Sequence, residues 1–313
     1  MNRTIDFLIV TDQDIPNDAS NIKVLNCTLN QVKNRIVKYI GFDVWLEKPY
    51  KLCDFRPLYC YLFQEYIGGY AFWGYCDCDL IFGDIRKFVT DDILERNDCI
   101  GAMGHFHLQR CKDPKYEGVW KSARGLWNEM RWQDVFKSPR NEWFDECPYG
   151  VSGRYYEMYP GRFWSGFEPE GRCYDAPSSS YLQFIDGYNC YELYKNDPGY
   201  QNHTDRLAFW KREKCSELKN IVYIKEKTSL YALGINSGGE IEKREIMYAH
   251  FIKRKFTLKT SNLQSYMIYP NVFSRKKILG KLSIMWYANN PLLLFRMICN
   301  RLFTKKICVL NGK

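Results

Sequence analysis

Short apolar runs alternate with polar stretches along the first 100 residues and predict alternating strands and helices. The run Ile5–Val10, interrupted only by Asp6, predicts a buried strand, and residues 23–25 predict a second short strand. Leu29, Val32, Ile36 and Ile40 recur at helical spacing. Residues 29–40 are therefore expected to form an amphipathic helix.

A second helix and a strand follow with little linker between them. The helix is expected to start at Asp54, with Pro57 in its first turn, and to end at Gly68-Gly69. A strand over residues 70–76 comes next. This strand–helix–strand alternation predicts an open α/β sheet, in which ligands gather at the carboxyl ends of the strands.

Later elements rest on shorter patterns. Residues 112–171 are rich in Trp, Tyr, Gly and Pro with little periodicity, and we expect long loops and short elements that wall a site. The remaining expected elements are a helix over 85–94, strands at 99–102 and 221–224, and a hairpin of 230–235 with 241–248 around Asn236-Ser237-Gly238-Gly239.

Composition and charge narrow the class of protein. The chain has 313 residues, of which 46% are hydrophobic and 17% aromatic, so a globular protein rather than a disordered one is expected. The net charge of +9 is concentrated at the C-terminal end, because residues 246–313 hold 13 Lys and Arg and no acidic residue. The rest carries 32 basic against 36 acidic residues. Such a segment binds an anionic membrane surface, nucleic acid or a phosphorylated substrate, or it is a solvated basic face. No nucleic-acid recognition motif accompanies the charge, so nucleic acid is not an expected partner.

Location and redox state follow from a few further features. Residues 282–298 are apolar but interrupted by Asn289-Asn290-Pro291 and Arg296. The run is too short to span a membrane, so it either lies on a membrane surface or packs on the body. No N-terminal signal is visible, and the odd number of cysteines, thirteen, indicates reduced thiols in a cytoplasm. Cys53, Cys60, Cys76 and Cys78 lack the paired spacing of a zinc site.

The candidate chemistry concentrates where the strand over residues 70–76 ends. Alternate residues of an extended chain point the same way, so Asp77 and Asp79 can direct two carboxylates at one point. Buried carboxylates are costly unless they are paired or hold a metal. Two hard oxygen ligands suit Mg²⁺ or Mn²⁺ carried by a diphosphate. The structural alternative is a turn after a strand, where aspartate is common.

At this point the chain resembles the DUF6625 group of bacterial polysaccharide-locus proteins, which are presumed glycosyltransferases. The likeness extends from about residue 5 to about residue 256. The residues that carry it are Lys51-Leu52-Cys53-Asp54-Phe55-Arg56-Pro57, residues 72–85, Gly104-His105-Phe106, Phe144-Asp145-Glu146 and His250-Phe251-Ile252-Lys253-Arg254.

The order of these motifs is also similar to GT-A sugar transferases with a Ser-Asp-x-x-Arg element, although here Arg56 follows Asp54 by two residues rather than three. The resemblance implies an α/β protein of the GT-A (Rossmann-like) fold, an open mixed sheet flanked by helices, over residues 1–256. Residues 257–313 would then be a basic, amphipathic, helical C-terminal extension. Relatives start with another strand that ends in a Pro-Tyr-Phe-Gly type loop, which this chain lacks, so a truncated relative with impaired donor binding is an open alternative.

The resemblance also implies a metal site and a donor site. Asp79 is expected to bind Mn²⁺ or Mg²⁺ directly, Asp77 to reach the metal or the donor ribose, and His250 to be a late ligand next to the cation Lys253. The other residues expected to contact the nucleotide sugar are Thr11, Asp12, Lys51, Asp54, Arg56 and His105. Asp54 equally suits a helix N-cap, and His105 equally suits a core position.

The acceptor side is less defined. Asp145 and Glu146 are candidates for the catalytic base that deprotonates an acceptor hydroxyl, if the reaction inverts the anomeric centre; a solvated acidic loop is the alternative. A band of tryptophans either stacks acceptor sugars or packs in the core: Trp120, Trp127, Trp132, Trp143 and Trp164.

The function expected from these residues and the resemblance is metal-dependent glycosyl transfer. The donor is a nucleotide-diphosphate sugar, and the acceptor is a growing surface glycan or a lipid-linked glycan at the inner face of the cytoplasmic membrane. A nucleotidyl- or phosphotransferase would use the same two carboxylates, and a non-catalytic truncated relative would bind without turnover. The sequence leaves open the donor sugar, the linkage, and whether the reaction retains or inverts.

Overall fold

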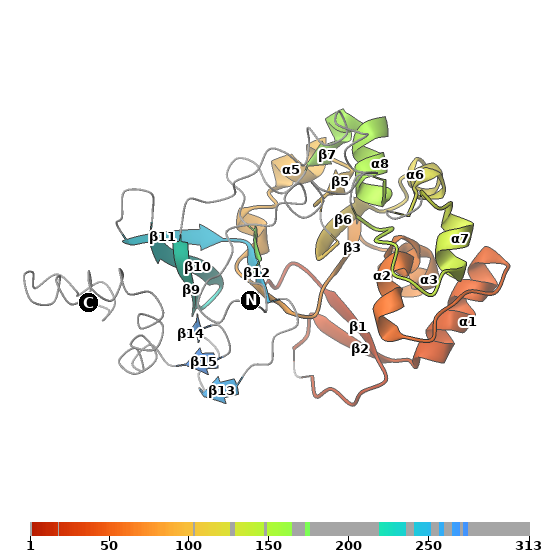
Figure 1. Cartoon of the computed structure of the whole chain (residues 1–313). Coiled ribbons are helices and arrows are strands. Elements are labelled where there is room, and N and C mark those ends of the chain that lie inside the picture. The colour runs from red at the N-terminus through yellow and green to blue at the C-terminus, as the bar shows by residue number, and fades with distance from the viewer. Residues whose placement is uncertain are drawn as a thin grey trace, which may run out of the picture.

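The chain forms a mixed α/β structure with several small sheets, in which helices and strands alternate up to β7 and the described elements after it are all strands (Figure 1). This computed structural model describes residues 2–17, 19–102, 104–125, 129–146, 149–164, 173–175, 219–235, 241–251, 257–259, 265–269 and 272–274. The prediction of an α/β protein is confirmed. The described strands pair into four separate sheets and not into the single open sheet that the sequence predicted.

The N-terminal strands and the first helix follow the sequence pattern closely. Strands β1 (Phe7–Thr11) and β2 (Ile22–Asn26) pair in parallel. Helix α1 (Leu29–Ile40) has the predicted bounds. Thr28 starts it with a capping box, in which the Thr28 hydroxyl accepts from the Gln31 amide at 3.2 Å, and Gly41 ends it at φ 83°.

The second predicted helix starts earlier than expected and is broken into short pieces. It begins at Pro49, so Asp54 lies inside the helical stretch and is not its N-cap. Pro57 has no amide hydrogen to continue the helical ladder, and the chain changes between α and 3₁₀ geometry there. The pieces are η1 (Pro49–Lys51), α2 (Leu52–Phe55), η2 (Arg56–Leu58), α3 (Tyr59–Leu62) and α4 (Gln64–Ile67).

A four-stranded sheet positions Asp77, which directly follows one of its strands, β3. Its strands are β3 (Phe72–Cys76), β6 (Phe106–Arg110), β5 (Cys99–Ile100) and β7 (Phe163–Trp164), in that spatial order. Strand β3 runs antiparallel to β6. Gly74 allows this close pairing, because a Cβ there would lie 2.6 Å from the Leu108 side chain.

Two further sheets bring the C-terminal half of the described chain against the N-terminal half. The three-stranded sheet has the order β4 (Leu80–Phe82), β12 (Tyr248–His250) and β8 (Cys173–Asp175). The six-stranded sheet has the order β11 (Ile241–Ile246), β10 (Ser229–Ile235), β9 (Lys219–Glu226), β14 (Ser265–Tyr269), β15 (Val272–Ser274) and β13 (Thr257–Lys259).

The predicted hairpin is confirmed as the antiparallel pair β10 and β11. Its second strand is shorter than the expected 241–248, because the chain leaves β11 at Ile246 and joins β4 as β12 from Tyr248.

Several loops and helices differ from the expectation. The single helix predicted over 85–94 is wrong: η3 (Ile85–Lys87) and α5 (Asp91–Arg96) are separate, and Thr90 caps α5 with its hydroxyl. Residues 112–171 were expected to form long loops and short elements; the short elements include helices, which bury aromatic side chains in the core. They are α6 (Tyr116–Ser122), α7 (Trp132–Lys137), α8 (Val151–Met158) and η4 (Pro160–Arg162).

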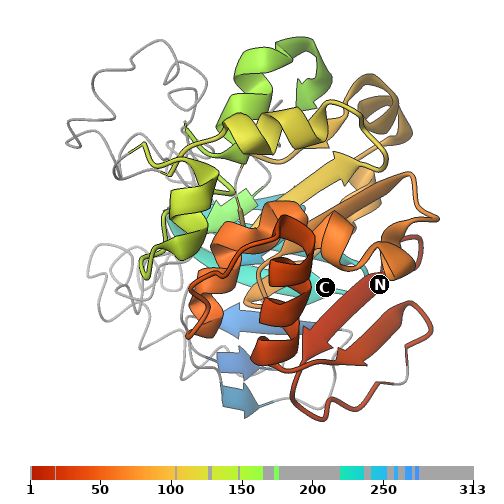
Figure 2. The same cartoon turned by 90° about the vertical axis from the view of Figure 1, so that its right-hand side faces the viewer.

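The largest core lies between β3 and the helices α1, α2, α3, α6 and α7, which group on one side of the molecule (Figures 1 and 2). Its largest fully buried side chains include Phe55, Trp120, Phe136 and Phe144. A smaller core joins β4, β6 and β12 through Phe82, Phe106 and Tyr248. Packing on both sides therefore fixes the β3–β4 connection that carries Asp77 and Asp79.

The C-terminal expectation is wrong for its first part. Residues 257–259, 265–269 and 272–274 form strands where a helical extension was predicted. The apolar run 282–298 lies outside the described residues. Within the part of the chain that the structure describes, no helix is long and apolar enough to cross a membrane.

Candidate functional site

Two connections that are far apart in sequence meet at the candidate site. Asp77 follows β3, Asp79 precedes β4, and His250 ends β12, which pairs antiparallel with β4 so that His250 lies opposite Leu80. Backbone hydrogen bonds fix both aspartates: the Asp77 amide donates to the His105 carbonyl at 3.0 Å, and the Phe251 amide donates to the Asp79 carbonyl at 2.9 Å.

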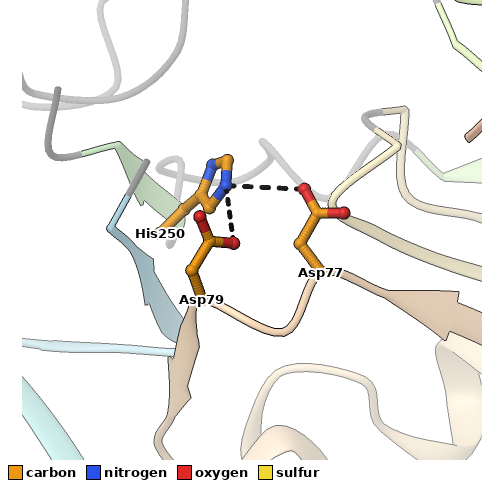
Figure 3. A group of neighbouring side chains, drawn as sticks. All are labelled: Asp77, Asp79 and His250. Carbon is orange, nitrogen blue, oxygen red and sulfur yellow. Dashed lines mark ion pairs between the residues drawn. The ribbon is translucent and has the colours of Figure 1, made fainter. Parts of the chain in front are cut away.

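The three side chains point toward one another (Figure 3). His250 Nε2 lies 3.4 Å from Asp77 Oδ2 and 3.3 Å from Asp79 Oδ1, and the ligand atoms all lie within 4.8 Å of one another. Donors bound to one Mn²⁺ or Mg²⁺ at about 2.1 Å lie about 3–4 Å apart, so the set fits such an ion with small side-chain movements. The two carboxylates match the ligands that Mg²⁺ and Mn²⁺ prefer, and the imidazole adds a nitrogen donor of the kind that Zn²⁺ and Fe²⁺ prefer.

Arg56 connects this cluster to a second acidic pair. Its guanidinium donates to Asp77 Oδ1, to Asp145 Oδ2 at 2.7 Å and to the Gly104 carbonyl at 3.0 Å. Charge-assisted bonds of this kind are the strong ones, and a planar fork can hold two carboxylates in fixed orientation. Arg56 therefore fixes one Asp77 oxygen while the other faces His250.

Asp145 and Glu146 lie beside Arg56. The Asp145 side chain is 2% exposed, and Glu146 Oε2 accepts from the Gly104 amide at 2.5 Å. Burial raises the pKa of Asp145 to about 6, although the Arg56 charge opposes this rise. Burial and the Asp145 charge raise the pKa of Glu146 to about 8. Two adjacent carboxyls with separated pKa values can hold one proton between them near neutral pH.

Gly104 makes this arrangement sterically feasible. A Cβ at Gly104 would lie 2.8 Å from the Arg56 guanidinium and closer still to the Asp145 carboxylate. In the sequence, Gly104 stands out only through the motif Gly104-His105-Phe106, which by itself assigns it no role.

His105 lies behind the metal-ligand candidates. Its ring is buried and lies 4.7 Å from the His250 ring and 5.4 Å from the Tyr248 ring, centroid to centroid. Burial and the charges of His250 and Arg56 lower the pKa of His105 well below its usual value, so it is neutral. It supports His250 from the interior, which agrees with the core position left open by the sequence.

Lys51 and Asp54 lie in the interior. The Asp54 side chain is 0% exposed and accepts from Lys51 Nζ at 2.8 Å and from the Glu142 and Phe144 amides at 3.0 Å each. Lys51 also donates to the Val135 and Arg140 carbonyls. These bonds tie α2 to the segment that carries Asp145, and this burial argues against the direct donor contacts that the sequence suggested for both residues.

The remaining sequence candidates lie elsewhere. Thr11 ends β1 and Asp12 follows it. Both accept hydrogen bonds from Gln13, the Thr11 hydroxyl from the Gln13 amide at 3.0 Å and Asp12 Oδ1 from the Gln13 side chain at 2.9 Å. Lys253 and Trp127 lie outside the described residues. Of the other tryptophans, Trp120 is buried in the core and Trp132 packs against it with ring centroids 5.2 Å apart.

The chain belongs to DUF6625, a family of unknown function, which matches residues 1–277. No curated protein and no solved structure matches the chain. The family assigns no activity, so the function has to be argued from the site.

Proposed function

We propose that this protein is a metal-dependent glycosyltransferase that moves a sugar from a nucleotide-diphosphate sugar to a growing surface glycan. The observation that carries the proposal is the convergence of Asp77, Asp79 and His250. Asp77 directly follows β3 and His250 ends β12, and an arginine and two carboxyls adjoin the cluster. The resemblance to GT-A sugar transferases, with their Asp-x-Asp motif, supports the same activity.

Each residue has a role that its chemistry allows. Asp79, His250 and Asp77 would hold Mn²⁺ or Mg²⁺, which when bound neutralises the negative charge that develops on the departing nucleoside diphosphate. Arg56 orients Asp77.

The acidic pair supplies the proton chemistry of an inverting transfer. Glu146, the more exposed of the two carboxyls, accepts the proton of the acceptor hydroxyl, and Asp145 stays paired with Arg56. The Gly104 amide holds Glu146 at one oxygen, which leaves the other carboxylate oxygen to meet the acceptor.

The acceptor and location are part of the proposal. A lipid-linked glycan at the inner face of the cytoplasmic membrane suits a protein whose residues 246–313 carry 13 basic and no acidic side chains. The basic segment would hold the protein against anionic lipid by electrostatic attraction.

The test is calorimetric titration of the purified chain with UDP, GDP, CDP and dTDP, with and without Mn²⁺. We expect Mn²⁺-dependent binding of one nucleotide. Outer-shell partners of metal sites contribute about 10–100-fold to affinity, so Asp79→Asn, which removes a direct ligand, should weaken the binding by at least about 100-fold. Asp43→Asn is the matched control, because Asp43 is 83% exposed and pairs with Lys33.

Product analysis separates the rival activity. A glycosyltransferase releases the nucleoside diphosphate from its donor, whereas a nucleotidyl- or phosphotransferase releases pyrophosphate or a phosphorylated product. Absence of binding to all four nucleotides in a folded sample, or unchanged binding by Asp79→Asn, would refute the metal-site assignment.

A further inference from the structure

An exposed aromatic side chain lies on a turn that is hydrogen-bonded to the segment leading into the acidic pair. Tyr50 is 61% exposed, the highest value among the large hydrophobic side chains of the described residues. It lies in η1 between Pro49, which restricts the backbone, and Lys51, whose ammonium is fixed in the interior by Asp54. The ring is therefore presented to solvent from a backbone that cannot easily move.

Asn141 joins this turn to a second aromatic residue. Its Nδ2 donates to the Tyr50 carbonyl at 3.3 Å, and its Oδ1 accepts from the Trp143 amide at 2.9 Å. Trp143 is partly exposed and has φ 51°, in the left-handed region that bulky residues rarely adopt. Such a conformation persists only where the surroundings enforce it, and it concentrates at ligand sites.

The surroundings that enforce it belong to the site. Asp54 accepts hydrogen bonds from the Glu142 and Phe144 amides, on either side of Trp143. Asp145 and Glu146 follow directly in the chain. Partial burial raises the pKa of the Tyr50 phenol, and the charges of Glu146 and Asp77 raise it further.

We propose that Tyr50 and Trp143 form a carbohydrate-binding platform that seats a pyranose ring of the acceptor beside Glu146. An aromatic face packs against the apolar C–H face of a sugar, and neighbouring polar groups hold its hydroxyls. Glu146, the more exposed carboxyl of the acidic pair, supplies such a group, while Asn141 joins the backbones of the two aromatic residues. The acceptor is favoured over the donor because the base has to reach an acceptor hydroxyl within hydrogen-bond distance. This inference rests on the proposed function.

The test is saturation-transfer-difference NMR with the methyl glycosides of glucose, galactose, N-acetylglucosamine and rhamnose as probes. The wild-type chain should transfer saturation to at least one glycoside. Removal of one aromatic contact should weaken binding modestly, so Tyr50→Ala should weaken that glycoside's binding by about 2–12-fold. Tyr50→Trp should retain it, and Tyr70→Ala, at a tyrosine that is 47% exposed elsewhere, is the matched control.

A parallel titration with Mn²⁺ and the nucleotide that the wild type binds keeps the two proposals distinguishable. Tyr50→Ala should leave nucleotide affinity unchanged within about twofold, while failure of the proposed function would show as no nucleotide binding in the wild type. The platform is overturned if no glycoside receives saturation from the wild type, or if Tyr50→Ala and Tyr70→Ala behave alike. Loss of nucleotide affinity in Tyr50→Ala with glycoside binding intact overturns it as well, because the ring would then serve the donor.

Discussion

Adding one methyl group at Gly104 should disrupt the contacts between the metal-ligand candidates and the acidic pair. The Gly104 carbonyl accepts from Arg56 at 3.0 Å, and its amide donates to Glu146 at 2.5 Å. In Gly104→Ala the new Cβ would lie 2.8 Å from the Arg56 guanidinium and closer to the Asp145 carboxylate. Both groups are largely buried and bonded to each other, so neither can move away freely.

The expected cost follows from the bonds that would have to shift. A hydrogen bond to a charged group contributes about 1.5–3 kcal/mol, and forcing an extra carbon into a packed site costs about 1–3 kcal/mol. Gly104→Ala should therefore lower the free energy of unfolding by about 3 kcal/mol. Because Arg56 also holds Asp77, Mn²⁺-dependent nucleotide binding should weaken in the same variant.

Urea unfolding followed by fluorescence measures the free energy, and a second glycine supplies the control. Gly118 lies inside α6, and a Cβ there would meet nothing within 4 Å. Gly118→Ala should stabilise the protein by about 0.5–1 kcal/mol, because alanine is favoured over glycine inside a helix. A Gly104→Ala variant as stable as Gly118→Ala would refute the steric account of the site.

Three further predictions concern buried titrating groups. Burial alone would raise the Asp98 pKa, but hydrogen bonds from its cationic neighbours Arg162, Lys115 and Arg110 hold it well below its usual value. Asp98→Asn should therefore lower the free energy of unfolding at pH 7 by about 2–3 kcal/mol. In urea titrations the difference from wild type should begin to shrink only as the pH falls below about 4, and it should vanish as the pH falls through the much lower pKa of the folded state. Burial lowers the pKa of His107 to about 4, so the unfolded chain binds a proton that the folded chain does not, and wild-type stability should fall by about 3 kcal/mol from pH 7 to pH 4. In His107→Gln the free energy of unfolding should fall less over this pH range, because the contribution of His107 is missing. An identical pH dependence of stability in both proteins would contradict the assignment. If Glu146 is the base, the rate of sugar transfer by the wild type at saturating Mn²⁺ should rise with pH up to about 8. Glu146→Gln should lose this rise. A rise that persists in the variant would assign the base to another residue.

Elements stabilised by local interactions could be predicted from the sequence. The period of apolar residues and the flanking Thr28 and Gly41 define α1, and its bounds agree with the prediction. The β10–β11 hairpin is likewise local, since its two strands adjoin one turn. The short helices α6 and α7 were missed, because six or seven residues give too few turns for a helical period to stand out.

In the candidate site, too, local features could be predicted from the sequence and long-range contacts could not. The Asp-x-Asp spacing was visible in the sequence, although residues 78 and 79 form a turn between β3 and β4 and not the extended segment that was expected. The turn still brings both carboxylates next to His250. That Asp54 is a buried partner of Lys51 rather than a helix cap depends on the Glu142 and Phe144 amides, which come from a segment 88 and 90 residues away. No local pattern reports such a contact.

The sequence by itself determined the α/β class, helix α1, the β10–β11 hairpin and the two aspartates after β3, Asp77 and Asp79. Only the tertiary structure decided that β12 pairs with β4, so that His250 meets Asp79, and that Arg56 reaches Asp77 and Asp145 at once. The physical reason is that turns, caps and periodicity depend on neighbours along the chain. The position of a charge in the interior instead depends on which distant segments pack together to compensate its lost hydration.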